Sequence, residues 1–245
     1  MLGIQQNLLK KSELEINMYS LVSQKALIVI PAFNEGSYIE KVIENCKELF
    51  PNILIVDDGS EDNTSKILHK IKDIFLIKHC LNCGQGTAIS SGLQFFLNNT
   101  NLQYLITIDA DGQHDPKEAY DLLNHAKMNN YDVVLGSRFL DKSTISIPRK
   151  RIFALKIAVL FENLFYGIKL SDAHNGLRVL SRQACESLNY LDASGMAHAT
   201  EIPSRLCKAG YDLNEFPCKV NYTLDKDSTT LISSLNIISD LLQRK

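Results

Sequence analysis

Three features that would assign this 245-residue chain to other functional classes are missing or scarce. No run of 18 uncharged apolar residues exists, so the sequence predicts no membrane-spanning helix. The nearest approach, residues 152–170, is interrupted by Lys156, Glu162, Asn163 and Lys169. The net charge is only −2, so no overall positive field draws the chain to nucleic acid or anionic lipid. Any phosphate-binding surface must therefore be local.

A secretory signal is also missing from the first 20 residues, which mix charged and polar side chains. Without such a signal, the six scattered cysteines are expected to be reduced thiols in a cytoplasmic protein. Cys80 and Cys83 form a Cys-x-x-Cys motif after His79. No second ligand pair at zinc spacing is evident and no thioredoxin-like context surrounds the motif, so we expect neither structural zinc nor redox chemistry there.

Apolar runs alternate with helical segments through the first 140 residues. Strands are expected near 26–30, 52–56, 73–77, 104–108 and 132–136, and helices near 37–49, 63–72, 86–98 and 116–128. This alternation predicts an α/β fold: a single domain with a mostly parallel sheet and helices on both faces. Further helices near 150–167, 181–188 and 198–209 and a short strand near 213–220 are expected beyond it.

The expected organisation is an N-terminal extension (1–24), one domain (25–225) and a C-terminal helix (226–245). Within the domain, residues up to about 140 form the expected nucleotide-binding half, and residues from about 141 the half expected to shape the acceptor site.

Polar motifs follow the first two expected strands, at the sheet edge where open α/β folds bind ligands. The first is Pro31-Ala32-Phe33-Asn34-Glu35, whose alternative interpretation is a helix N-cap by Asn34. The second is Asp57-Asp58-Gly59-Ser60. Two adjacent carboxylates repel each other, so the pair is best explained if a ligand donates hydrogen bonds to it. The alternative is a simple turn.

The fourth strand is followed by Asp109-Ala110-Asp111-Gly112-Gln113-His114. A helix start is clear at Asp115-Pro116, an N-cap acid followed by proline, so the preceding segment is a loop. Two carboxylates two residues apart on a loop can ligate one divalent cation, and Gln113 adds a neutral oxygen. The sequence therefore predicts a metal site there.

Four later segments offer further polar groups. Gly84 and Gly86 open a helix and suit either donor packing or a tight turn; the segment is neither a P-loop nor a dinucleotide fingerprint. Arg138, and the cluster at 148–151, can hold phosphate groups. The dense polar stretch 171–178 suggests a site-lining loop. Glu201 is either a general base or a helix-capping residue.

Together these motifs resemble the family 2 glycosyltransferases of GT-A fold, over about 26–222. The resemblance is strongest to the polyprenol-phosphate (dolichol-phosphate) sugar transferases and related bacterial surface-polysaccharide enzymes. It implies donor binding by Pro31, Ala32, Asn34, Glu35, Asp57, Asp58, Gly86, Asp109, Ala110 and Asp111, and Mg²⁺ or Mn²⁺ binding by Asp109, Asp111 and Gln113. It implies acceptor or phosphate contacts by Arg138, Arg149, Arg151 and Arg178.

The chain departs from that group in two places. His174-Asn175-Gly176 replaces a Thr/Ser-rich stretch, and residues 221–230 lack the usual arginine-bearing loop, for which Lys226 can substitute. The departures leave the acceptor open between a polyprenyl phosphate and a lipid-linked sugar.

The resemblance implies inversion in one in-line displacement. We expect Asp111, Glu201 and Asp172 to be the catalytic residues. A phosphate acceptor needs no strong base, whereas a sugar hydroxyl needs a carboxylate, Glu201 first and Asp172 second. The expected partners are a nucleoside-diphosphate sugar, a lipid-borne acceptor and a membrane protein, with no nucleic acid; the expected location is cytoplasmic, at the inner face of the membrane.

Two other classes stay open on the sequence. A sugar-nucleotide pyrophosphorylase would carry a basic, Gly-rich loop after the first strand, and PAFNEGSY has no lysine or arginine. A catalytically silent nucleotide-sugar-binding subunit of a polysaccharide-assembly complex would not require both Asp109 and Asp111.

Overall fold

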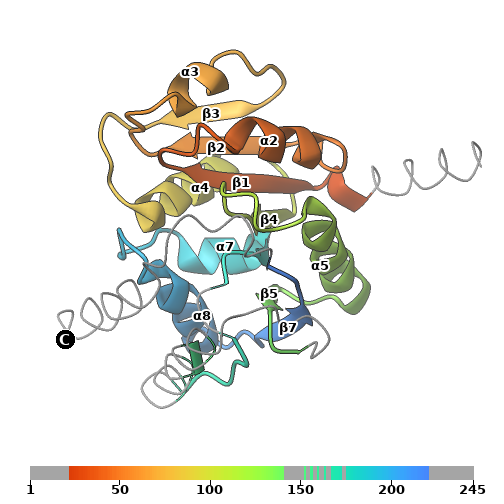
Figure 1. The fold of residues 1–245 in the computed structure, drawn as a ribbon. Helices are drawn as coiled ribbons and strands as arrows, with labels where there is room; N and C mark the ends of the chain where they lie inside the picture. Colours follow the sequence, from red (N-terminus) through yellow and green to blue (C-terminus); the bar gives the residue numbers. More distant parts are fainter. Residues whose placement is uncertain are drawn as a thin grey trace, which may run out of the picture.

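The computed structural model describes residues 22–140, 152, 155, 156, 159, 163, 167–172 and 175–220. Within them, seven strands form one sheet in the order β3-β2-β1-β4-β6-β5-β7 (Figure 1). The strands are β1 (Ala26–Ala32), β2 (Ile53–Asp57), β3 (Phe75–Lys78), β4 (Tyr104–Thr107), β5 (Val133–Ser137), β6 (Arg178–Ser181) and β7 (Asn214–Pro217). The helices are α2 (Ile39–Lys47), α3 (Thr64–Leu68), α4 (Gln85–Asn99), α5 (Pro116–Asn129), α7 (Arg182–Leu188) and α8 (His198–Lys208).

The sheet is parallel except at β6, which is antiparallel to both β4 and β5. This strand was not expected from the sequence, where its residues fall at the end of a polar loop. Its four residues begin with an arginine that is 3% exposed, paired across the sheet with Thr107. A short segment with a buried charge gives little periodic signal, so the pairing with β4 and β5 decides it.

Helices cover both faces of the sheet, as the alternation predicted. Successive side chains of β1 point to opposite faces: Ile28 and Ile30 pack with α2 and α5, whereas Leu27 and Val29 pack with α4, α7 and α8. The central strands are therefore buried on both faces, which explains their continuous apolar runs.

Strand β1 extends two residues further than expected and includes Pro31 and Ala32. Pro31 is in register with Val56 of β2, but Ile28 N–H donates toward β2 and Val29 accepts from the β4 side, so position 31 faces β4. Proline is tolerated because β4 pairs only with residues 26–29 of β1, which leaves no partner for an N–H at position 31. The strand consequently carries the chain directly to the ligand-binding edge.

The predicted start of α5 is confirmed. The Asp115 carboxylate accepts a hydrogen bond from the Lys117 backbone N–H at 2.9 Å, and Pro116 occupies the first helical position. The start of α2 differs, because its N-cap is Tyr38 and not Asn34. The capping interpretation of Asn34 is therefore wrong.

Several expectations fall outside the described residues: Arg149, Arg151, most of the helix near 150–167, His174, Lys226 and the C-terminal helix. No helix in the described part of the chain is long and apolar enough to cross a bilayer.

Candidate active site

A cavity of about 370 Å³ opens at the carboxyl ends of β1, β2 and β4. It collects residues from four of the motifs found in the sequence. Its lining consists of Pro31, Ala32, Phe33, Glu35, Asp58, Asn82, Gly84, Gln85, Ala88, Asp109, Ala110, Asp111 and Met196. Segments far apart in the chain meet there because the carboxyl ends of parallel strands share one edge of the sheet.

Asp109 lines this cavity. Its Oδ1 accepts a hydrogen bond from Gln85 Nε2 at 2.9 Å, and its Oδ2 lies 3.8 Å from His114 Nε2. Burial raises the pKa of Asp109, and the nearby Arg178 guanidinium opposes that rise. A carboxylate placed at such a cost in solvation is a good ligand for a cation entering the cavity.

Asp111 shares the cavity with Asp109 and is partly exposed. Its Oδ1 accepts a hydrogen bond from the Gln113 backbone N–H at 2.9 Å, which holds the loop turned. Two hard oxygen ligands that line one cavity fit Mg²⁺ or Mn²⁺. Gln113 lines a neighbouring cleft of about 990 Å³ instead, so its role as a third ligand stays a prediction.

His114 and Glu118 also line this larger cleft, beside Lys219. Burial lowers the pKa of His114 to about 4, so the ring is neutral at pH 7. Burial raises the pKa of Glu118 to about 7, and its Oε1 accepts a hydrogen bond from the Lys219 backbone N–H at 2.7 Å.

The adjacent carboxylates Asp57 and Asp58 point in different directions and have different partners. Asp57 is 1% exposed and accepts hydrogen bonds from the Ser60 backbone N–H and the Ser65 hydroxyl, so it holds its own turn. Asp58 lines the cavity and accepts backbone N–H bonds from Cys83 at 3.0 Å and Gly84 at 2.7 Å. The sequence suggested that a ligand would donate hydrogen bonds to these two carboxylates. In the structure, groups of the protein itself donate to both.

Glu35 faces the cavity, whereas Asn34 ties two loops together. The Asn34 side-chain oxygen accepts from the Glu61 backbone N–H at 2.9 Å, and the Asn34 backbone N–H donates to Ser60 Oγ at 3.0 Å. Asn34 also has a positive φ of 57°, which asparagine tolerates better than most residues. A positioning role fits Asn34 better than direct donor contact.

Gly86 lets helix α4 approach the loop before α8. A Cβ at this position would lie 1.8 Å from the Ala193 carbonyl oxygen. The glycine is thus explained by backbone packing, and its donor contact stays a prediction.

Arg138 and Asp172 form a buried ion pair. The Arg138 Nε and Nη2 donate to the two carboxylate oxygens of Asp172, both at 2.7 Å, and the Arg138 backbone N–H donates at 2.9 Å. The arginine is 8% exposed and the aspartate 5%. A phosphate contact by Arg138, or base catalysis by Asp172, would have to compete with this pair. Arg178 is buried beside Asp109 and does not line the cavity.

Glu201 lies in the first turn of α8, where its carboxylate accepts backbone N–H bonds from Asp192 at 2.8 Å and Ala193 at 2.7 Å. Arg205 Nη1 donates to the same group at 2.9 Å. The helix-capping alternative for Glu201 is wrong, because α8 has Ala197 as its N-cap and no side-chain hydrogen bond to the cap. The Glu201 oxygens instead hold the loop that Gly86 packs against, which is a structural role of another kind.

Gln85 and Met196 are among the lining residues that were not singled out from the sequence. Gln85 stands between the two glycines of a motif that was recognised, and its amide reaches Asp109. Met196 comes from the loop before α8, and its sequence surroundings carry no signal.

Comparisons with known proteins concern the family and the fold. The sequence model of the family described as Glycosyl transferase family 2 matches residues 27–188. A UDP-N-acetylglucosamine–dolichyl-phosphate N-acetylglucosaminyltransferase from Methanococcus voltae is 30% identical over 80% of this chain and 85% of its own length. A polyprenol monophosphomannose synthase from Mycolicibacterium smegmatis is 26% identical over 88% of this chain and 83% of its own length.

Among solved structures, glucosyl-3-phosphoglycerate synthase from Mycobacterium tuberculosis, crystallised with Mn²⁺, UDP and glucosyl-3-phosphoglycerate, superposes with a TM-score of 0.63. It is 18% identical, over 92% of this chain and 83% of its own, a likeness that concerns the fold. The family match covers well over half of the chain, and the predicted fold is confirmed. The chain belongs to glycosyltransferase family 2 and is a glycosyltransferase of GT-A fold.

Proposed function

We propose that the protein transfers a sugar, with inversion, from a nucleoside-diphosphate sugar to a polyprenyl phosphate. The observation that carries the proposal is the single cavity that gathers Glu35, Asp58, Asp109 and Asp111 at the edge of the sheet. Relatives named for transfer to dolichyl phosphate and for polyprenol monophosphomannose synthesis support the acceptor class.

The nucleoside would bind between the ends of β1 and β2. Asp58 offers carboxylate oxygens there, and Pro31 and Ala32 form an apolar wall. Because the Asp58 carboxylate is fixed by two backbone N–H groups, it is oriented before any ligand arrives. These contacts do not identify the nucleobase of the donor.

Asp109 and Asp111 would hold Mg²⁺ or Mn²⁺, which supplies positive charge next to the departing diphosphate. Gln85 orients Asp109 through its 2.9 Å hydrogen bond, and the neutral ring of His114 adds no competing charge. Gln113 is kept as a third candidate ligand, which would require it to turn from the larger cleft.

The chain's own carboxylates favour a phosphate acceptor over a sugar hydroxyl. A hydroxyl acceptor needs a base, and both candidates, Glu201 and Asp172, are engaged by an arginine and by backbone N–H groups. A phosphate monoester has its second pKa near ~6 and is largely ionised at pH 7, so it attacks without a base. Arg149 and Arg151 are proposed to hold that phosphate, and residues 152–170 to lie against the lipid or a membrane partner.

The test measures release of nucleoside diphosphate and labelling of lipid acceptor across a panel of donors, with Mn²⁺ or with EDTA. Wild type should transfer only when metal and polyprenyl phosphate are both present. Replacing Arg149 and Arg151 together by alanine should lower transfer about 10- to 150-fold for each arginine that binds the phosphate, and leave donor hydrolysis in place.

Asp111→Asn, which removes a proposed metal ligand, should stop transfer. Its matched control is Asp121→Asn, on the exposed side of α5, which should behave as wild type. Donor binding without turnover on any acceptor would favour the catalytically silent subunit. Transfer to a lipid-linked sugar, stopped by Glu201→Gln, would replace the phosphate acceptor with a hydroxyl.

A further inference from the structure

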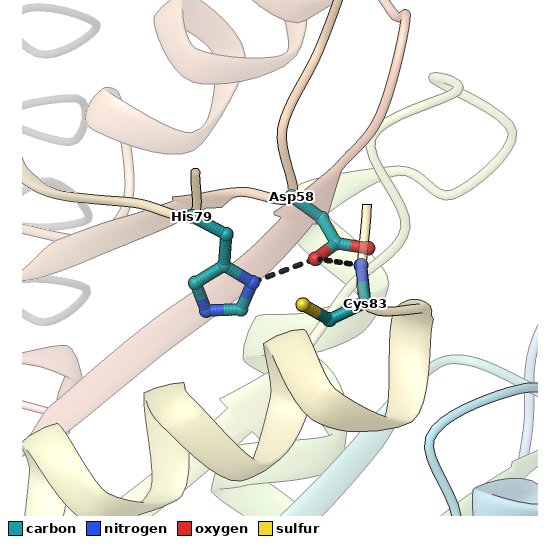
Figure 2. A group of neighbouring side chains, drawn as sticks. All are labelled: Asp58, His79 and Cys83. Carbon is teal, nitrogen blue, oxygen red and sulfur yellow. Dashed lines mark hydrogen bonds and ion pairs between the residues drawn. The ribbon is translucent and has the colours of Figure 1, made fainter. Parts of the chain in front are cut away.

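Three potential metal ligands of different chemistry lie close together, away from the Asp109–Asp111 pair, in what we call the corner of Asp58, His79 and Cys83. Asp58 follows β2, His79 follows β3, and Cys83 precedes α4, and their side chains point toward one another (Figure 2). One ligand atom from each lies within 4.8 Å of the other two. The sequence offered Cys80-x-x-Cys83 after His79 without a second ligand pair; the fold brings Asp58, from the end of β2, next to His79 and Cys83.

The corner is already organised by hydrogen bonds. His79 Nδ1 lies 2.6 Å from Asp58 Oδ1, and His79 Nε2 lies 2.9 Å from Ser91 Oγ. The other Asp58 oxygen accepts from the Gly84 backbone N–H. In metal-binding histidines, the ring nitrogen that does not bind the metal usually forms a hydrogen bond to a nearby oxygen, which sets the ring orientation. Here Ser91 Oγ is the oxygen that holds His79 Nε2.

The chemistry of the three groups indicates which ion they would bind. Thiolate, imidazole and carboxylate together match zinc, whereas Mg²⁺ and Mn²⁺ prefer oxygen ligands throughout. The Cys83 thiol is exposed and makes a weak 3.4 Å contact to the Leu81 carbonyl oxygen, so it leaves an entry path for an ion. We propose that Asp58, His79 and Cys83 bind one Zn²⁺ ion, with water in the fourth position.

Binding requires a small adjustment that the contacts allow. Ligand atoms around tetrahedral zinc lie about 3.4 Å apart, given bond lengths of about 2.0–2.3 Å. Asp58 and His79 must therefore separate by roughly 1 Å, while the exposed Cys83 side chain closes in. The ion replaces the proton shared by His79 and Asp58 and the thiol proton of Cys83, so zinc uptake releases protons.

This site goes beyond the proposed function and is separate from the proposed Mg²⁺ or Mn²⁺ ligands. It would link β2, β3 and the start of α4 through one ion. Because Asp58 also lines the 370 Å³ cavity, a bound zinc ion would lie beside the proposed nucleoside position.

The binding test uses the full chain stripped by a chelator, without donor or acceptor, so it is independent of glycosyl transfer. Zinc is titrated against a chromophoric chelator, and Co²⁺ is used as a spectroscopic substitute that shows a thiolate charge-transfer band. Wild type should take up one equivalent and release protons. Cys83→Ser and His79→Gln should each weaken binding at least about 100-fold and remove or shift the cobalt band.

Cys80→Ser is the matched control, because it makes the same change at another exposed thiol of the same loop. It should bind zinc as wild type does, and so should Asp111→Asn. Equal loss in Cys80→Ser and Cys83→Ser would assign the ion to the two cysteines and overturn the proposed ligand set. Zinc affinity unchanged by Cys83→Ser, with the variant folded by circular dichroism, would overturn the site itself.

Discussion

Gly176→Ala tests whether the position of Asp109 governs activity. A Cβ at residue 176 would lie 2.1 Å from Asp109 Oδ2 and 2.5 Å from both Oδ1 and Cγ. The backbone at 176 cannot easily retreat, because its carbonyl accepts a 2.6 Å hydrogen bond from Thr107 Oγ1, next to the start of β6. The carboxylate of Asp109 must therefore move.

The size of that movement follows from the contact distances. Ordinary van der Waals contact begins near 3.4 Å, so Oδ2 must shift by about 1.3 Å. The shift would break the hydrogen bond from Gln85, worth about 1 kcal/mol, in addition to about 1–3 kcal/mol for overpacking. Tm should fall by roughly 4–15 °C, which leaves a folded protein at 25 °C.

Activity should fall much further than stability. A misplacement of about 1 Å at a reacting centre costs on the order of 100-fold in rate, and Asp109 is a proposed metal ligand. The assay pairs nucleoside-diphosphate release with Mn²⁺ affinity at 25 °C, and thermal unfolding is measured on the same samples. We expect kcat/KM to fall about 100-fold and Mn²⁺ to bind more weakly.

Gly210→Ala separates this effect from a general loss of stability. Gly210 has a φ of 89° and no atom within 4 Å of an added Cβ, so alanine brings only backbone strain of about 1–2 kcal/mol. This control should lose a few degrees in Tm and keep its activity. Wild-type turnover and Mn²⁺ affinity in Gly176→Ala would refute the reasoning, because Asp109 would then tolerate displacement.

Three further predictions concern single carboxylates. Asp111→Asn should abolish metal-dependent turnover with little change in Tm, because the residue lies on a partly exposed loop; full activity of this variant in EDTA would contradict the metal assignment. Asp172→Ala should lower the free energy of unfolding by about 3–5 kcal/mol, because it leaves Arg138 charged and buried, and a wild-type denaturation midpoint would count against this. Glu118 has its pKa raised from 4.5 to about 7 by burial, so the folded state holds the proton more tightly than the unfolded state. Its ionised form therefore destabilises the protein fully above pH 7 and hardly below pH 4.5. Glu118→Gln should raise Tm at pH 8 and have little effect at pH 4.5, and equal gains at both pH values would argue against the shift.

Elements whose signal is local could be predicted from the order of the amino acids. Apolar runs bounded by helical segments predicted five parallel strands, and Asp115-Pro116 predicted the start of α5. The family could be predicted as well, because several motifs occur in the right order after the right strands. The Asp109–Asp111 spacing is local too, so its place at the cavity could be predicted.

Which polar groups have partners depends on tertiary structure. In the sequence, Asp57 and Asp58 are equivalent neighbours; in the fold, one caps a turn and the other lines the cavity. Glu201 and Asp172 were the first and second candidate bases from the sequence, and only their hydrogen-bond partners show that both carboxylates are already engaged. Arg138 lies 34 positions from Asp172, beyond the reach of local pattern. Arg205 is only four positions from Glu201, but the backbone N–H groups of the preceding loop that bind Glu201 could not be placed from the sequence.

The antiparallel strand β6 and the corner of Asp58, His79 and Cys83 have the same origin. Strand β6 exists because β4 and β5 leave a gap that its backbone fills by hydrogen bonding on both sides. The corner exists because β2 and β3 end side by side, which brings residues 58, 79 and 83 together. Periodicity determines an element's type, but only pairing across the sheet determines its neighbours, and the neighbours decide the chemistry.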